Sequence, residues 1–418
     1  MNKRTKTALR RWCLYGWTFA KWTMAASAIG VVCGLIGTMF HFGVHEVTAF
    51  RGTHPWVLYL LPLAGFVIVS FYKLTETDGL GTDDIIDAVH AGKRLPILLL
   101  PAIFFGTVLT HLCGGSAGRE GAALQMGGTI GQCMGRTFRL DDRDLRVATL
   151  AGMAAFFSAL FGTPLAATVF AIMVISIGVL YHVALYPSLL AALVAYGVSV
   201  RLGVEPTRFT VAVPDQSVGM FVRVAALGVL CALVSILFCK LMHGAGHLMK
   251  RIKNPWLRVI CGGFAVIALT WIFGTDYNGA GMDIVTRAIE QETVAVPWAF
   301  LLKLVFTAVT LAAGFKGGEV VPSFFVGATF GCAAGALLGL PPGFAAAIGL
   351  VAVFCGAVNC PIASVILSIE LFGSGGLVYF AAACALSYLL SGYCGLYSSQ
   401  TILYSKLKAE FINVHTHE

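Results

Sequence analysis

Long stretches without a charged residue constrain this chain more than any other feature. Asp, Glu, Lys and Arg are all absent from Trp22–His45, Gly52–Tyr72, Leu95–Gly118, Val147–Val200, Val320–Ile369 and Leu371–Ser405. Each stretch meets or exceeds the roughly 18 to 20 residues with which a helix spans the hydrocarbon core of a bilayer. The sequence therefore predicts a helical protein that crosses a membrane several times.

The composition agrees with a lipid surrounding. Of the 418 residues, 58% are hydrophobic and 11% are charged, whereas roughly a quarter of an average soluble domain is charged. The 48 glycines favour close packing between helices. The first apolar stretch is too long for the hydrophobic region of a signal peptide, so we expect it to remain in the protein. The 12 cysteines include no C-x-x-C pair, and we interpret them as packing residues and predict no metal site.

The net charge of +8 reflects cations that stand at the ends of apolar stretches. They cluster in Lys3–Arg11, Arg136–Arg146, Lys240–Lys253 and Lys406–Lys408. The positive-inside rule places such clusters in the cytoplasm. We therefore expect both termini to be cytoplasmic, the number of spans to be even, and no nucleic acid to bind.

A polar connection divides the chain into nearly equal parts. We predict a cytoplasmic N-terminal segment at 1–21, a first membrane half at 22–200, a linker at 201–215, a second membrane half at 216–405 and a cytoplasmic tail at 406–418. Each half contains one uncharged stretch of about fifty residues, which is too long for one span and too short for three. Such stretches must fold into tightly turned or tilted, partly spanning helices.

The two halves repeat one another locally. The segment Thr163–Met173 (TPLAATVFAIM) aligns with Cys360–Glu370 (CPIASVILSIE), and each follows a glycine-rich segment, Gly114–Gly121 (GGSAGREG) or Gly317–Pro322 (GGEVVP). Two matches in the same order indicate duplication. If each half has an odd number of spans, the halves are inverted and their broken helices meet at the middle of the membrane.

Glu120 lies in the first glycine-rich break, inside an otherwise apolar segment. A carboxylate there is costly and is a functional hypothesis by default. Free backbone amides and the start of the following helix favour an anion at this place. Two interpretations stay open: Glu120 forms a structural ion pair with Arg119, or it occupies the anion position and leaves when protonated.

The second break repeats this design with Glu319, and its Pro322 is compatible with the first turn of a helix. Glu319 is either a second membrane-buried acid or a carboxylate that caps its own helix. In the segment Thr75–Val89, Thr82 and Asp83 are predicted N-cap residues for a helix from Ile85 onward. Tyr397 follows the last apolar stretch and is either an interface anchor or an anion ligand through its hydroxyl.

These motifs, in this order, resemble the CLC family of chloride channels and anion/proton antiporters. The resemblance rests on G-R-E-G before a helix, G-G-x-x-x-P in the second half and a Tyr at the start of a final helix, and it covers about residues 20 to 406. It implies an all-α polytopic membrane protein, an inverted repeat of two helical halves with broken, partly spanning helices. It also implies a homodimer with one anion pathway per subunit.

The resemblance implies specific roles for the residues of the breaks. Glu120 matches the gating glutamate, and Glu319 becomes a second candidate for gating and proton transfer. The residues expected at the anion are Gly118, Arg119, Gly121, Leu80, Gly81, Gly318, Val320, Phe324 and Tyr397. For Phe324 and Phe325, aromatic edges that face a small anion are one interpretation and core packing is the other.

Three departures from the chloride pattern indicate the fluoride-exporting branch. Leu80 replaces the coordinating Ser of G-S-G-I-P, although that branch commonly has Met there. Val174 stands ten residues after Pro164, where chloride exchangers have an internal glutamate, and Glu319 stands where they have an apolar residue. Together these departures resemble the CLC-F antiporters.

The sequence thus predicts a dimeric transporter in the inner membrane of a bacterium that exports fluoride in exchange for protons, without a cofactor and without enzymatic activity. A chloride channel or a chloride/proton exchanger is the alternative within the family. An intramembrane enzyme would need several histidines to converge with acids, and satisfied helix histidines are the commoner case. The histidines concerned are His41, His45, His90 and His111.

Overall fold

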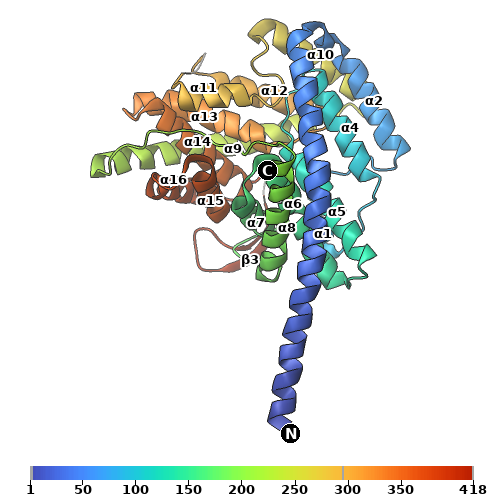
Figure 1. Cartoon of the computed structure of the whole chain (residues 1–418). Coiled ribbons are helices and arrows are strands. Elements are labelled where there is room, and N and C mark those ends of the chain that lie inside the picture. Colours follow the sequence, from blue (N-terminus) through green and yellow to red (C-terminus); the bar gives the residue numbers. More distant parts are fainter. Residues whose placement is uncertain (1–2, 294–295, 417–418) are drawn as a thin grey trace.

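A computed structural model describes residues 3–293 and 296–416 of the chain (Figure 1). Residues 1–2 of the expected N-terminal segment and 417–418 of the expected tail lie outside the described residues. The helices of the first half are α1 (Lys3–Thr53), η1 (Pro55–Leu60), α2 (Leu61–Leu74), α3 (Thr82–Ala91), α4 (Leu99–Leu112), α5 (Glu120–Thr137), α6 (Asp142–Phe161), α7 (Pro164–Met173), η2 (His182–Ala184) and α8 (Leu185–Arg201). Those of the second half are α9 (Val218–Lys250), α10 (Pro255–Phe273), α11 (Met282–Glu290), α12 (Ala299–Ala313), α13 (Val320–Leu337), α14 (Pro342–Val358), α15 (Pro361–Phe372) and α16 (Leu377–Leu390).

Within the described residues, seven helices are long and apolar enough to cross a membrane, and shorter apolar helices lie beside them. The uncharged stretch of the first half contains most of α6, all of α7 and most of α8, and α7 has only 10 residues. That of the second half contains α13 and α14 and most of α15, which has 12 residues. The prediction of partly spanning helices inside these stretches is therefore confirmed. Helix α1 continues in Figure 1 as a single rod from the N-terminal end to the far side of the helical body.

The two halves have the same local backbone geometry at matching places. Helices α5 and α13 each have 18 residues, and the residues before them have nearly equal dihedral angles: φ −109° and ψ −7° at Arg119, φ −94° and ψ −15° at Glu319. The residues before α7 and α15 agree even better, with φ −120° and ψ 71° at Thr163 and φ −119° and ψ 71° at Cys360. The predicted duplication is thus present in the backbone itself.

Glycine brings neighbouring helices together in the same way in both halves. A Cβ atom on Gly127 of α5 would lie 2.3 Å from the carbonyl oxygen of Gly152 in α6, and a Cβ on Gly327 of α13 would lie 2.3 Å from that of Gly349 in α14. Neither pair has room for a side chain. The predicted use of glycine for close helix packing is confirmed at these positions.

A small sheet is the part of the fold that the all-helical prediction misses. It consists of β1 (Ser176–Ile177), β2 (Thr401–Tyr404) and β3 (Phe411–His415), in the order β1-β2-β3, with β1 parallel to β2 and β2 antiparallel to β3. The expectation that Tyr397 begins a final helix is wrong, because Tyr397 lies in the irregular segment before β2. The β-branched and aromatic residues that follow it favour a strand instead.

The predicted cap of the helix after Gly79 is also wrong. Helix α3 begins at Thr82, and Gly81 is its N-cap residue. The side chain of Asp84 accepts a 2.9 Å hydrogen bond from the backbone amide of Gly81, which satisfies this amide. Since Asp84 supplies the cap, Asp83 is free for a different contact, described below.

Candidate functional site

The two glycine-rich breaks cross at the centre of the fold and bind to each other. The backbone amide of Gly118 donates to the carbonyl oxygen of Gly318, and the amide of Gly318 donates to the carbonyl of Gly118, both at 2.8 Å. The N-termini of α5 and α13 therefore start from one antiparallel bridge. Two helix N-termini that converge in an apolar surrounding concentrate partial positive charge and unpaired amides.

Glu120 is the first residue of α5 and is fully buried. Its Oε2 accepts a 2.9 Å hydrogen bond from the backbone amide of Arg119, and its Oε1 lies 3.6 Å from Arg119 Nε. Oε1 has no hydrogen-bond partner in the described part of the chain. The ion pair with Arg119 is thus present, and it leaves one carboxylate oxygen unsatisfied.

Glu319 is the residue before α13, and its side chain forms no capping hydrogen bond with that helix. Its Oε2 is buried without a hydrogen-bond partner among the described residues. The same atom would lie 3.2 Å from a Cβ atom on Gly121, in the first turn of α5. The interpretation of Glu319 as a cap of its own helix is therefore wrong, because its carboxylate points to the opposite helix.

Gly118, Gly121 and Gly318 leave no room for side chains where the breaks cross. A Cβ on Gly318 would lie 2.2 Å from the backbone nitrogen of Gly121, and a Cβ on Gly118 would lie 2.5 Å from Oε2 of Glu120. Only glycine allows the two backbones to approach this closely. The glycines predicted at the anion are thus required by the crossing itself.

Tyr397, Leu80 and Gly81 lie together on the side of Glu319. Asp83 joins the two segments, because its Oδ1 accepts a 3.1 Å hydrogen bond from the amide of Ser399. The buried hydroxyl of Tyr397 has no hydrogen-bond partner among the described residues. Leu80 is half-buried and packs against the core.

Val320 and Phe324 are buried in the first turns of α13. The ring of Phe324 meets the rings of Phe161 at 5.9 Å and Phe354 at 5.2 Å, both edge to face. These contacts support core packing for Phe324. Phe325 lies beneath the ammonium group of Lys303, 5.2 Å from the ring centre.

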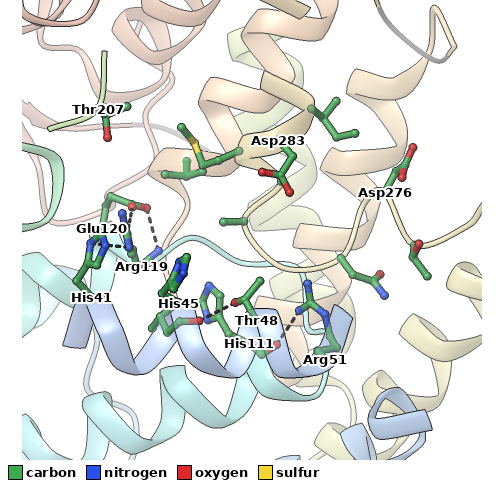
Figure 2. Close-up of a pocket in the computed structure, with 18 of the residues that line it drawn as sticks. His41, His45, Thr48, Arg51, His111, Arg119, Glu120, Thr207, Asp276 and Asp283 are labelled. Atoms are coloured by element: carbon green, nitrogen blue, oxygen red, sulfur yellow. Dashed lines mark hydrogen bonds and ion pairs between the residues drawn. The ribbon is translucent and has the colours of Figure 1, made fainter. Parts of the chain in front are cut away.

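A cavity of about 400 Å³, which we call the vestibule, opens beside Glu120 (Figure 2). Its polar lining comes from α1, α4, the start of α5, α11 and the segment before α11, and it includes His41, His45, Arg51, His111, Arg119, Glu120, Asp276, Asp283 and Arg287. Glu319 does not line this cavity. Of the two glutamates at the crossing, only Glu120 therefore borders the vestibule.

Three of the four histidines noted in the sequence converge in the vestibule. His41 Nδ1 lies 3.1 Å from Nη1 of Arg119, and the rings of His41 and His45 stack with centres 6.4 Å apart. His111 is buried, with its Nδ1 2.9 Å from the carbonyl of Thr107. His90 lies elsewhere and contacts the carbonyl of Ile175 at 3.1 Å. The sequence did not reveal this convergence, although the i, i+4 spacing of His41 and His45 places both on one helix face.

Lys303 is a buried cation that was not singled out from the sequence. It is fully buried in α12, and its Nζ donates to the carbonyls of Tyr277 at 3.1 Å and Gly279 at 2.6 Å. It thereby holds the segment that forms one wall of the vestibule. A single lysine in the otherwise uncharged segment 293–315 was the available signal, since intramembrane cations are rare.

Val174 is buried and cannot carry a proton, as predicted from the sequence. The side-chain amide of Gln400 donates to the carbonyl of Val174 at 2.9 Å and to that of Val358 at 3.0 Å. Val174, which stands ten residues after Pro164, thus takes part in a hydrogen-bonded contact between the two repeats and the C-terminal segment. Among the described residues, no group of three or more His, Cys, Asp or Glu side chains is arranged to hold a metal ion.

Comparisons with known proteins agree on one family. Residues 63–392 match the sequence profile of the voltage gated chloride channel family. A chloride/fluoride channel protein of Pseudomonas syringae is 39% identical over 93% of this chain and 88% of its own length. An H(+)/Cl(-) exchange transporter ClcA of Vibrio vulnificus is 26% identical over 88% of this chain and 86% of its own length.

Solved structures agree with these sequence matches. The crystal structure of a CLC-type fluoride/proton antiporter superposes with a TM-score of 0.89 and 31% identity, covering 92% of this chain and 99% of that one. A slow cyanobacterial Cl-/H+ antiporter superposes with a TM-score of 0.78 at 19% identity, covering 89% of this chain and 94% of that one, and shows the shared fold alone. The predicted fold of two inverted helical halves with broken helices is confirmed.

Proposed function

Because the chain belongs to the voltage gated chloride channel (CLC) family, we propose that it is a fluoride/proton antiporter that exports fluoride across a bacterial inner membrane. The placement of Glu120 and Glu319 carries this proposal. Glu120 is fully buried and Glu319 is partly buried at the crossing of the breaks, and each has one buried carboxylate oxygen without a hydrogen-bond partner among the described residues. Two titratable groups thus stand where an anion would meet the helix N-termini.

Fluoride is strongly hydrated, and a site that takes it from water must replace several hydrogen bonds at once. Backbone amides at the starts of α5 and α13 and the unpartnered hydroxyl of Tyr397 supply donors. A protonated carboxyl adds an O–H donor at the same place. We therefore assign proton transfer to Glu120 and Glu319. Anion contact is assigned to Gly118, Arg119, Gly121, Gly318, Val320, Phe324, Leu80, Gly81 and Tyr397.

Chloride/proton exchange is the alternative, and some relatives of this chain carry that activity in their names. Val174 disfavours chloride/proton exchange, because this apolar side chain stands in place of the inner proton-carrying group. The backbone carbonyl of Val174 accepts a hydrogen bond from Gln400. Glu319 provides a second titratable group at the crossing, outside the vestibule lining. The relative at 39% identity, with fluoride in its name, and the fluoride/proton antiporter structure at 31% identity favour fluoride.

The deciding experiment compares anions in proteoliposomes that contain the purified full-length protein. We expect an outward fluoride gradient to drive proton uptake, and an equal chloride gradient to drive little. Equal proton uptake with both anions contradicts fluoride specificity. Fluoride release without proton movement contradicts exchange and indicates a channel.

The arrangement in the membrane is part of the proposal. We propose that both termini face the cytoplasm, so that the vestibule opens to the outside, since it adjoins the end of α1 away from the N-terminus. The unit boundaries 1–21, 22–200, 201–215, 216–405 and 406–418 remain predictions. Accessibility of Cys13, which is exposed near the start of α1, to a membrane-impermeant thiol reagent tests the orientation in right-side-out vesicles.

We also propose that the protein is a homodimer and a transporter without enzymatic activity. Leu165 of α7 and Ile362 of α15 each follow the proline that begins their helix, and each side chain is 50% exposed. Because α7 and α15 are in contact, these equivalent apolar side chains provide a candidate face for a second copy. Native mass measurement in detergent, with Leu165→Trp as the disrupting variant, tests this proposal.

A further inference from the structure

Arg119 is shared between Glu120 and a histidine that the proposed transport reaction does not use. Its Nε lies 3.6 Å from Oε1 of Glu120, and its Nη1 lies 3.1 Å from Nδ1 of His41. Figure 2 shows dashed contacts from Arg119 to both residues at one end of the vestibule. The third contact of its guanidinium group, to the carbonyl of Leu160, is 3.5 Å long.

The hydrogen bond between Arg119 and His41 fixes the protonation of the imidazole. An arginine donates and does not accept, so Nδ1 of His41 must be the acceptor and cannot carry a proton. His41 is therefore neutral while this bond is formed. The side chain is only half-buried and lines the vestibule, which gives it access to water.

We infer that His41 is a positioning residue for the gate: the neutral imidazole holds part of the guanidinium group of Arg119 away from Glu120, and protonation of His41 from the vestibule restrains proton uptake by Glu120. The inference rests on the proposed fluoride/proton exchange. A proton on Nδ1 removes the acceptor for Arg119 and adds a positive charge. Both changes drive Arg119 toward the carboxylate of Glu120, and nearby positive charge favours the ionised carboxylate.

Other charged and titratable groups also face this part of the vestibule. On α1 itself they are His45 and Arg51, on α4 His111, on α11 Asp283 and Arg287, and Asp276 on the segment before α11. The part of α6 that reaches Arg119 is the backbone carbonyl of Leu160. Among the described residues, only His41 forms a side-chain hydrogen bond with Arg119. We therefore assign the restraint of exchange at acid pH to protonation of His41.

Two substitutions separate positioning from titration. In His41→Asn, Oδ1 takes the place of Nδ1 and still accepts from Arg119, but the side chain cannot take up a proton. In His41→Phe, the ring remains and the acceptor is lost. Because a hydrogen bond to a charged group is strong, we expect the Phe variant to slow exchange by about tenfold or more at neutral pH.

The experiment measures fluoride-driven proton uptake in proteoliposomes at equal pH on both sides, between about pH 4 and 8, a range that extends below the ordinary titration of histidine because the guanidinium of Arg119 opposes a second positive charge on His41. We expect the wild-type rate to rise as the pH falls and then to decline at the acid end. The Asn variant should match the wild type at neutral pH and lack the acid decline. Size-exclusion profiles and unfolding temperatures verify that each variant is folded.

His45→Asn and His182→Asn are the matched controls. His182 is exposed and is not part of the vestibule lining, so its substitution should leave the acid decline in place, as should that of His45. The inference is overturned by a wild type without an acid decline, by an Asn variant that retains it, by a Phe variant at the wild-type rate, or by loss of the decline in His45→Asn. Absence of fluoride-driven proton uptake in the wild type at neutral pH would instead refute the proposed function.

Discussion

Gly118 and Gly318 are paired by two reciprocal backbone hydrogen bonds of 2.8 Å, one from each repeat to the other. This pair joins the starts of α5 and α13, so the geometry of one break depends on the other. Glu120 comes two residues after Gly118 in the sequence, and Glu319 comes directly after Gly318. A change at the bridge should therefore affect both glutamates at once.

Gly318→Ala should disable transport. The added Cβ would lie 2.2 Å from the nitrogen and 2.8 Å from the Cα of Gly121, both backbone atoms that cannot give way without moving α5. Overpacking of this kind costs about 1 to 3 kcal/mol, and displacement of both glutamates should lower fluoride turnover by more than about tenfold, since misplacement by about 1 Å can cost a hundredfold. Turnover in proteoliposomes checks this.

Gly197→Ala is the matched control for this substitution. Gly197 lies in α8, and a Cβ atom added to it would meet no other atom within 4 Å. Alanine there should leave transport unchanged and slightly stabilise the helix. Normal turnover in Gly318→Ala would show that the bridge does not hold the transport site.

Glu120→Gln should abolish proton coupling. The amide has nearly the size of the carboxylate but cannot bind and release a proton, and it cannot form the ion pair with Arg119. We expect fluoride-driven proton uptake to fall to the level of empty vesicles. Glu46→Gln, which changes an exposed glutamate on α1, should leave uptake unchanged. Proton uptake at the wild-type ratio in Glu120→Gln would exclude Glu120 as the gate.

The long uncharged stretches and the duplicated motifs were sufficient to predict the helical repeat. The uncharged stretches predict helices because, in lipid, each span must form all of its backbone hydrogen bonds within the protein. The motifs predict the repeat because broken helices need glycine and proline at defined places. Glu120 and Glu319 stood out for the same reason, since acids are rare in apolar segments. Their positions could be predicted without any knowledge of tertiary contacts.

The surroundings of these acids could not be predicted, because they depend on contacts between distant segments. The carboxylate of Glu319 lies against Gly121 of the other repeat, which excludes the self-capping that its sequence position allowed. The convergence of His41 with Arg119 joins α1 to the first break. Tyr397 was expected at a helix start, but pairing of β2 with β1 and β3 determines the conformation after it.

Tyr397→Phe should weaken fluoride binding without lowering stability. The hydroxyl of Tyr397 has no hydrogen-bond partner among the described residues, so its loss removes no bond within the protein. A hydrogen bond to an anion is worth about 1.5 to 3 kcal/mol, and the loss should raise the fluoride Kd by about tenfold or more. Calorimetric titration with fluoride in detergent measures the Kd.

Tyr379→Phe should have the opposite pair of effects and is the control for Tyr397→Phe. The hydroxyl of Tyr379 donates to the carbonyl of Asp215 at 3.0 Å, so its removal should lower the unfolding temperature and leave fluoride affinity unchanged. If Tyr397→Phe also lowers only the unfolding temperature, Tyr397 is a structural anchor.

Lys406 should make stability depend on pH in the alkaline range. Its Nζ donates to Oδ1 of Asn359 at 2.5 Å and to the carbonyl of Tyr388 and Oγ of Ser391, both at 3.1 Å. Burial is the main cause that lowers the pKa of Lys406 from its ordinary value of 10.5 to about 8. Between pH 8 and 10.5 the unfolded chain therefore binds more protons at this position, and the contribution of Lys406 to stability rises with pH.

Unfolding temperatures in detergent test this pH dependence. From pH 8 to pH 10, we expect the unfolding temperature of the wild type to rise relative to that of Lys406→Met, and the difference to be constant below pH 8. Lys408→Met changes an exposed lysine two residues later and should follow the wild type. Parallel curves for the wild type and Lys406→Met would contradict the prediction.

Glu319→Gln decides between fluoride/proton exchange and an ordinary chloride pathway. The carboxylate lies beside the start of α5 and makes no hydrogen bond that caps α13. Two negative charges about 4 Å apart repel by roughly 4 kcal/mol at an effective dielectric constant of 20, so Glu319 must hold a proton when fluoride is beside it. Glutamine keeps the size of the side chain but cannot bind and release this proton. The substitution should therefore reduce fluoride/proton exchange to near background while the protein stays folded.

The control is Glu410→Gln, an exposed change in the C-terminal segment, and this variant should exchange fluoride for protons at the wild-type rate. A Glu319→Gln variant with the normal rate and proton ratio would show that Glu319 takes no part in coupling, and the assignment to fluoride would then depend on Leu80, Val174 and the similarity to proteins with fluoride in their names.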